Sequence, residues 1–476
     1  LGGVLGLTFA FGGTDILLSL IPEEIPRMAS VSVDWTVLGF TMFIAMTTGL
    51  LFGLLPALQS SGGNLMTAVR EGGGKHTAGR TRRNLRNGLI IGEVAISLIL
   101  LVGAGLMVRT FMALNEVNPG FDPVDVHTAR VWIPESRYGE DALVTGFYRE
   151  VIERMDARPE VEGAAAVLSL PIDPGISGTL SFSIQDRPSE PGQDPVCGFQ
   201  LVSADYFRIM GIPLLSGRML ERTDNENGPQ VAVINQALAE ELWSGDNPLG
   251  KQVTWGDPSS DEVEWVEIVG IVGNTRFESL DSEPRSEIFR PISQSPMPFL
   301  TIVIKSQAEP EMVYVSLRQV VADIDADQPV TEMASMEEVL STSLAQRRFN
   351  MQLLGLFALV ALLMAAVGLY SVLSFSVAQR SGEIGVRVAL GAGSWSVIGL
   401  IVRDGFRMVL FGLGAGIAGA LLMRRLVSNM VYGVNALDPL TLLAGISLLA
   451  VIALLACLLP AWRAARIDPM VVLTRD

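Results

Sequence analysis

The chain has 476 residues, of which 49% are hydrophobic, and its mean hydropathy is +0.41, which excludes an ordinary soluble protein of this size. The net charge of −16 is unevenly spread: residues 112–346 carry 39 acidic and 15 basic side chains, a net −24, and the remainder carries 11 and 19, a net +8. Such an acidic segment argues against nucleic acid as its partner. Cys197 and Cys457 are the only cysteines, and the apolar surroundings of Cys457 argue against a disulfide between them.

Six apolar runs are long enough to be transmembrane helices. They cover residues 1–20, 35–58, 89–111, 349–377, 397–427 and 440–460. No basic region precedes the first run, which begins at Leu1, so we predict a sequence that starts inside a longer protein rather than at a signal peptide. The basic linker 59–88 belongs in the cytoplasm, and alternation then places residues 112–346 outside and the tail 461–476 in the cytoplasm.

Residues 112–346 contain no run of membrane length and read as alternating strands and helices. We predict helices at 139–158, 236–243 and 313–323, and strands at 161–170, 231–235, 265–272, 301–305 and near 330. Breaks rich in Pro and Gly at 171–178 and 188–195 indicate two lobes. The predicted fold is therefore a polytopic α-helical membrane protein with an inserted α+β, two-lobed outer domain. His76 and His127 are isolated and are expected on the surface.

Part of the chain is repeated. The sequence Leu-Leu-Pro-Ala at 54–57 recurs at 458–461, and the same offset of 404 maps Asp34 onto Asp438 and Met66 onto Met470. The matching residues lie at both ends of a span and share one offset, which indicates internal duplication. The chain would then hold the end of one unit, in residues 1–58, and all of a second.

One polar stretch, residues 379–393, lies between two apolar runs. Glu383 and Arg387 are four residues apart and would pair on one face of a helix, and Ile384 adds an apolar contact point beside them. Gly391 is in place to end such a helix. Two interpretations stay open here: a docking surface for a partner, or a solvated helix that only connects two spans.

Motifs for chemistry are missing. The sequence Gly-Gly-Gly-Lys-His-Thr at 72–77 fails as a phosphate loop because Val69 stands where the first glycine is required. The glycines of residues 412–419 lie in a span and indicate close helix packing rather than nucleotide binding. Glu93 also lies in a span, where snorkelling of its side chain is favoured over a relay or an interhelix contact. We therefore expect no catalysis, no cofactor and no bound metal.

Several motifs together resemble a known family. Residues 379–392, with the sequence QRSGEIGVRVALGA, resemble the cytoplasmic segment of FtsX-type permease domains, and residues 460–469, PAWRAARIDP, resemble the tail of those domains. Other motifs resemble the MacB-like periplasmic core domain: VSADYF at 202–207, MGIP at 210–213, SGR at 216–218, VIN at 233–235, NPLGK at 247–251 and IVGIVG at 268–273. The duplication resembles the acidobacterial duplicated orphan permeases.

The resemblance implies a permease subunit of an ABC transporter of the mechanotransmission type, in the inner membrane, with the 112–346 domain in the periplasm and an FtsX-like permease domain at 349–460. A separate cytoplasmic ATPase would dock on a coupling helix. Besides that ATPase, the implied partners are membrane lipid and, as a further option, a periplasmic or outer-membrane protein. The docking residues carried over are Arg380, Glu383, Ile384, Gly385, Arg387 and Gly391.

Two functions remain open. One is ATPase-driven export or extraction of a hydrophobic or amphipathic substrate, and the other is regulation of an outer enzyme such as a cell-wall hydrolase.

Overall fold

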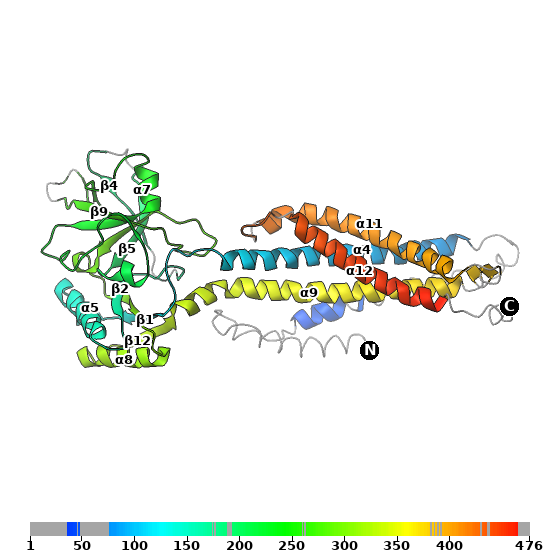
Figure 1. Ribbon diagram of the computed structural model, residues 1–476, viewed down its shortest axis with the longest axis horizontal. Helices are drawn as coiled ribbons and strands as arrows, with labels where there is room; N and C mark the ends of the chain where they lie inside the picture. Colours follow the sequence, from blue (N-terminus) through cyan, green and yellow to red (C-terminus); the bar gives the residue numbers. More distant parts are fainter. Residues whose placement is uncertain are drawn as a thin grey trace. The chain divides into compact units, whose positions relative to one another are not determined.

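The computed structural model of the chain comprises two compact units, Leu1–Asn115 with Ala345–Asp476, and Glu116–Leu344 (Figure 1). It describes residues 36–44, 46–47, 76–173, 175, 178–187, 193–258, 260, 263–380, 383–384, 386–387, 390, 393–428, 431–435 and 438–464. The predicted span 1–20, the first copy of the repeat at 54–57 and the end of the tail lie outside these residues. So does most of the basic linker.

Four described helices of the first unit are long and apolar enough to cross a membrane. They are α4 (His76–Asn115), α9 (Met336–Gln379), α11 (Ser394–Ser428) and α12 (Pro439–Ala464). A lipid interior offers no hydrogen bonds to the backbone, which is why these apolar runs fold as helices. The predicted span 35–58 is described only at residues 36–44 and 46–47, which are helical, so the total of six spans stays a prediction.

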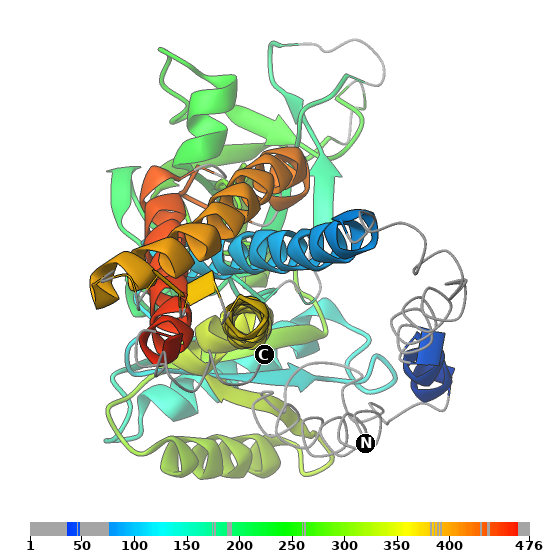
Figure 2. The ribbon, with the colours of Figure 1, turned by 90° about the vertical axis from the view of Figure 1, so that its right-hand side faces the viewer.

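Glycines let α11 approach α4 closely. A Cβ atom at Gly412 would lie 2.7 Å from the Cβ of Val94, and one at Gly416 would lie 3.0 Å from the carbonyl oxygen of Ala95. By contrast, a Cβ at Gly414 would meet nothing within 4 Å. The prediction that these glycines serve helix packing is therefore confirmed for Gly412 and Gly416. Figure 2 looks along the bundle and shows α11 in orange beside α4 in blue.

Two polar contacts tie the other helices of this unit together. At the outer end, Asp438 caps the start of α12 by accepting a hydrogen bond from the backbone N–H of Thr441 at 2.8 Å, and it also pairs with Arg109 of α4. Within the membrane, the carboxylate of Glu93 lies against Gly368 of α9, where an added Cβ would be 2.5 Å from Oε2. Glu93 thus lies beside α9, but its side chain is only partly buried, so the choice between snorkelling and an interhelix contact stays a prediction.

The second unit is built on one mixed sheet of twelve strands, in the order β12-β1-β11-β2-β5-β10-β7-β9-β8-β4, with β3 paired to β5 and β6 to β9. The strands are β1 (Val126–Trp132), β2 (Gly163–Val167), β3 (Gly178–Ser181), β4 (Ser183–Ile184), β5 (Val196–Val202), β6 (Leu214–Gly217), β7 (Val231–Asn235), β8 (Gln252–Thr254), β9 (Val266–Val272), β10 (Glu287–Pro291), β11 (Phe299–Lys305) and β12 (Val330–Ser335). Its helices are α5 (Asp141–Asp156), α6 (Tyr206–Ile209), α7 (Gln236–Leu242), η2 (Ile292–Gln294) and α8 (Pro310–Ile324).

The predicted helices and strands of this unit are confirmed, with ends shifted by a few residues. Phe147, Val151 and Met155 repeat at helical spacing and are all buried on α5. The strands share one hydrophobic core, so the division into two lobes stays a prediction. The prediction for His127 was wrong. Its side chain is buried against α8, with the ring 5.7 Å from that of Tyr314 and Nε2 3.2 Å from the carbonyl oxygen of Ser306.

A capping box joins the sheet to α9. The backbone N–H of Ser335 donates to the carboxylate of Glu338 at 2.8 Å, and the N–H of Glu338 donates to the Ser335 hydroxyl at 3.1 Å. The last strand β12 therefore passes directly into α9, whose 44 residues continue without interruption to Gln379.

The sheet also buries an acidic group and a thiol. Glu287 of β10 is 1% exposed, lies 3.2 Å from Nε of Arg285 and accepts from the Thr275 hydroxyl at 3.4 Å. Burial raises the pKa of Glu287 to about 7, and the Arg285 guanidinium offsets part of this rise. Burial likewise raises the pKa of the Cys197 thiol to about 12. Cys197 and Cys457 are both free and buried.

Gly412→Ala should destabilise the membrane unit, because the added methyl meets Val94, and overpacking costs about 1–3 kcal/mol. Thermal unfolding of the purified chain in detergent measures this effect. Gly414→Ala is the matched control: its methyl meets open space, and the change favours a helix by about 1 kcal/mol. Equal unfolding temperatures of the two variants would show that the packing of α11 on α4 does not depend on this close approach.

Stability of the second unit should fall as the pH rises from about 5 to about 8. In the folded protein the pKa of Glu287 is raised above its ordinary value of 4.5. The contribution of this group to the free energy of unfolding is therefore complete below pH 4.5 and is lost as the pH rises through about 7. The change amounts to at most about 3 kcal/mol. Unfolding curves across this range should flatten for Glu287→Gln and keep their slope for the exposed Glu278→Gln. A wild-type profile as flat as that of Glu287→Gln would refute the assignment.

Candidate functional site

The polar stretch follows α9, which ends at Gln379. The backbone N–H of Arg380 donates to the carbonyl oxygens of Ser376 and Val377, both at 3.1 Å. The N–H of Ile384 donates to the carbonyl oxygen of Arg380 at 2.9 Å. Residues 383–384 and 386–387 are helical, as predicted from the spacing of their charges. Gly385 and Gly391, two of the six predicted docking residues, lie outside the described residues.

Ile384 anchors this stretch in the membrane bundle. Its side chain is 4% exposed and belongs to the core cluster of the four spanning helices. It lines a small pocket with Leu373 of α9 and Ile401 of α11. The one apolar docking residue in the described set is therefore turned inward, where it holds the stretch in place instead of facing a partner.

An ion pair reinforces the anchor. The Arg380 guanidinium lies 3.3 Å from Oδ2 of Asp404 on α11, and both side chains line the pocket that holds Ile384. They are roughly two-fifths exposed, so the pair is worth about 1 kcal/mol or less, and its role is to fix direction more than to add stability. Sequence reasoning missed Asp404 as the partner, although an acidic residue inside an amphipathic, membrane-bound run was a signal that such a partner existed.

The opposite face of the stretch carries the exposed groups. Glu383 and Arg387 pair across one helical turn at 2.8 Å, and about half of each side chain is exposed. Leu390 and Trp395 are both 83% exposed, and Val386 is also exposed. The exposed groups are therefore of two kinds, a charge pair and large apolar side chains. This composition is typical of protein interfaces.

This site has no chemistry of its own. Its described residues contain two carboxylates and two guanidiniums but no nucleophile paired with a base. The described part of the chain includes no group of three or more His, Cys, Asp or Glu able to hold a metal. What the arrangement offers is recognition: a stretch held in place by Ile384, with charged and large apolar side chains exposed. The surface is therefore suited to contact another protein.

Comparison with known families identifies the chain. The family described as MacB-like periplasmic core domain matches residues 88–328, about half of the chain, and the FtsX-like permease C-terminal family matches residues 355–469. The chain belongs to the MacB/FtsX-like family of ABC transporter permeases. The stretch 379–393 falls within the matched FtsX-like region. The chain is thus a multi-pass protein of the inner membrane whose MacB-like domain lies in the periplasm.

Individual relatives are distant. Macrolide export ATP-binding/permease protein MacB 2 of Aeromonas hydrophila is 24% identical over 403 residues, which cover 82% of this permease and 57% of that protein. The ABC transporter permease YknZ of Bacillus subtilis is 25% identical over 282 residues, or 56% of this chain and 68% of that one. The chain spans a little over half the length of the MacB relatives that it matches.

Among solved structures, the periplasmic region of MacB from Actinobacillus actinomycetemcomitans matches with a TM-score of 0.34 and 13% identity. The match covers 48% of this chain and 97% of that one. The TM-score and the identity are both low, so the family assignment rests on the matched sequence families.

Ile384→Ala should loosen the anchored stretch, because truncating a buried Ile costs about 2–5 kcal/mol. Hydrogen exchange of the peptide covering residues 380–387 in this permease measures the effect, and exchange should become faster. Val386→Ala, which changes an exposed side chain of the same stretch, should leave the rate near that of the wild type. If both variants exchanged like the wild type, Ile384 would not be the anchor.

Proposed function

We propose that this permease works by mechanotransmission: a separate cytoplasmic ABC ATPase docks on residues 380–393, and its ATP-driven movement is passed to the periplasmic domain for export or extraction of a substrate. The observation that carries the proposal is the two-sided character of the docking stretch. Ile384 is seated in the bundle, whereas the Glu383–Arg387 pair faces outward.

The buried position of the Ile384 side chain supports transmission of movement from the docking stretch into the membrane helices. Its pocket is lined by Leu373 of α9 and Ile401 of α11, and the Arg380–Asp404 ion pair spans the same two helices. A load on the docking stretch therefore acts on two helices at once. Dense packing passes displacement on, because close-packed interiors are stiff.

The continuity of α9 supports transmission out of the membrane. The helix runs from Met336 to Gln379 without interruption, about 66 Å at 1.5 Å per residue. Its first turn is fixed to β12 by the capping box of Ser335 and Glu338. β12 is in turn hydrogen-bonded to β1, with Val131 opposite Val330. Movement of α9 would therefore reach the edge of the periplasmic sheet directly.

The distribution of charge supports a cytoplasmic partner at the docking stretch. Arg380 and Arg387 lie in it, Arg403 and Arg407 lie in the first turns of α11, and Arg463 lies at the end of α12, where it donates to the Tyr370 hydroxyl at 2.8 Å. Basic residues concentrate at cytoplasmic ends of spans. The ATPase of an ABC transporter is found on that side.

Exchanging the two charges tests the docking role. Glu383→Arg with Arg387→Glu keeps an ion pair within the helix but reverses the charges offered to a partner. We expect each single change and the double change to reduce co-purification of the ABC ATPase by at least about tenfold, because an interface charge that loses its partner costs about 2 kcal/mol or more. The measurement is mass spectrometry of ATPase subunits retained by the purified permease.

The matched control is the pair Glu150–Arg154 on α5, which has the same order and spacing but belongs to the periplasmic domain. Its exchange should leave ATPase binding unchanged. Recovery of binding in the Glu383→Arg, Arg387→Glu double variant would mean that the pair only stabilises a connecting helix. Docking would then be excluded.

A further inference from the structure

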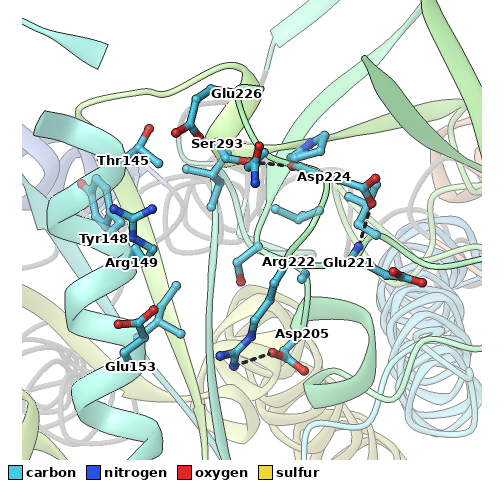
Figure 3. A pocket seen from close by; sticks show the side chains of 18 residues that line it. Thr145, Tyr148, Arg149, Glu153, Asp205, Glu221, Arg222, Asp224, Glu226 and Ser293 are labelled. Carbon is cyan, nitrogen blue, oxygen red and sulfur yellow. Dashed lines mark hydrogen bonds and ion pairs between the residues drawn. The ribbon is translucent and has the colours of Figure 1, made fainter. Parts of the chain in front are cut away.

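The periplasmic domain contains a cavity of about 280 Å³ that the proposed mechanism does not use. One wall is a stripe of α5 with Thr145, Arg149 and Glu153, and the other is the loop after β6, including Arg222 and Glu226 (Figure 3). The floor is apolar, with Ile152, Leu220 and Ile292. The volume is just below the range of cavities that hold drug-sized ligands, so a ligand here would be small.

The cavity lies where two parallel strands end together. β5 and β10 are parallel neighbours, and their last residues, Val202 and Pro291, stand opposite one another. Both residues line the cavity, as do Ser203 and Ser293, which follow these strands. The crevice beyond the carboxyl ends of parallel strands is a common ligand site in open sheets, because the chain turns away there and leaves room.

Some of the charges in the walls are already paired and serve to hold the cavity open. Asp224 is 4% exposed and accepts hydrogen bonds from both terminal nitrogens of Arg218, at 2.7 and 2.8 Å. Arg222 reaches from the loop to Asp156 at the end of α5, at 3.0 Å, and to Asp205 at 3.2 Å. The Arg222–Asp156 contact ties one wall to the other, so the cavity is preformed.

Other charges in the walls have no ion partner among the described residues. They are one guanidinium, Arg149, and three carboxylates, Glu153, Glu221 and Glu226, and all four side chains are exposed. In Figure 3 Arg149 and Glu153 extend from α5, and Glu226 stands on the opposite loop. A purely anionic ligand would face three carboxylates, and a purely cationic one would face Arg149. The mixed signs favour a ligand that carries both charges.

We propose that this cavity binds a small zwitterion of the amino-acid or short-peptide class. Arg149 receives the ligand carboxylate, Glu153 and Glu226 receive the ammonium group, and an apolar side chain of the ligand covers Ile152, Leu220 and Ile292. The ligand contacts both walls, so its binding reinforces the link that Arg222 makes between them. This site is independent of the docking stretch, because it requires neither an ATPase nor transport.

Isothermal titration of the full chain in nanodiscs with the dipeptide leucyl-leucine tests the proposal. We expect saturable binding, and we expect at least about tenfold weaker binding of N-acetyl-leucyl-leucine and of leucyl-leucine amide, each of which lacks one charge. No saturable binding at millimolar dipeptide would overturn the proposal. Equal binding of all three ligands would overturn it as well.

Two variants locate the site. Arg149→Ala should abolish the preference for the free dipeptide over its amide, whereas Arg154→Ala, on the same helix but outside the cavity and paired with Glu150, should bind like the wild type. Glu226→Gln should weaken the free dipeptide while leaving the N-acetyl ligand unchanged. Both Arg149 and Glu226 are exposed, so the variants should unfold at the wild-type temperature. Equal effects of Arg149→Ala and Arg154→Ala would exclude this cavity as the site.

Discussion

Close contact between α4 and α11 is the constraint on which the membrane unit depends. Helices in lipid gain no hydrophobic drive from associating, so they hold together through van der Waals contact and a few polar bonds. Gly412 and Gly416 allow that contact with Val94 and Ala95, and the pairing of Arg109 with Asp438 adds a polar bond at the outer end. The seat of Ile384 is built on the same bundle, since its lining comes from α9 and α11. The direction of the docking stretch thus follows from how tightly these helices pack.

The periplasmic domain is stabilised in a different way. It carries a large negative charge and has no disulfide, so its stability comes from one continuous core between a mixed sheet and helices such as α5 and α8. Charged groups inside this domain are held by neighbours of opposite sign, as Asp224 is by Arg218 and Glu287 by Arg285. Buried charges that are paired in this way are costly to disturb.

The sequence predicted local structure well because local structure follows from local patterns. Hydropathy located the spanning helices, and the strand at 231–235 was predicted to its last residue. The structure shows the Asn235 side chain capping α7 there, where it accepts from the N–H of Leu238. Contacts between distant residues were beyond such patterns. The 24-residue separation of Arg380 and Asp404 has no signature in periodicity, and neither does the parallel pairing of β5 with β10. His127 was misplaced for the same reason, since only the fold brings Tyr314 of α8 against it.

The two free cysteines have a practical consequence for experiments on this protein. Cys197 and Cys457 are each 2% exposed, and the raised pKa of Cys197 keeps its thiol protonated at neutral pH. The thiolate is the form that attacks thiol reagents, so neither buried residue should compete with an engineered surface cysteine. The unaltered chain is therefore a low-background host for site-directed labelling, in which a single probe at Leu390 or Met312 would report movement at one known place.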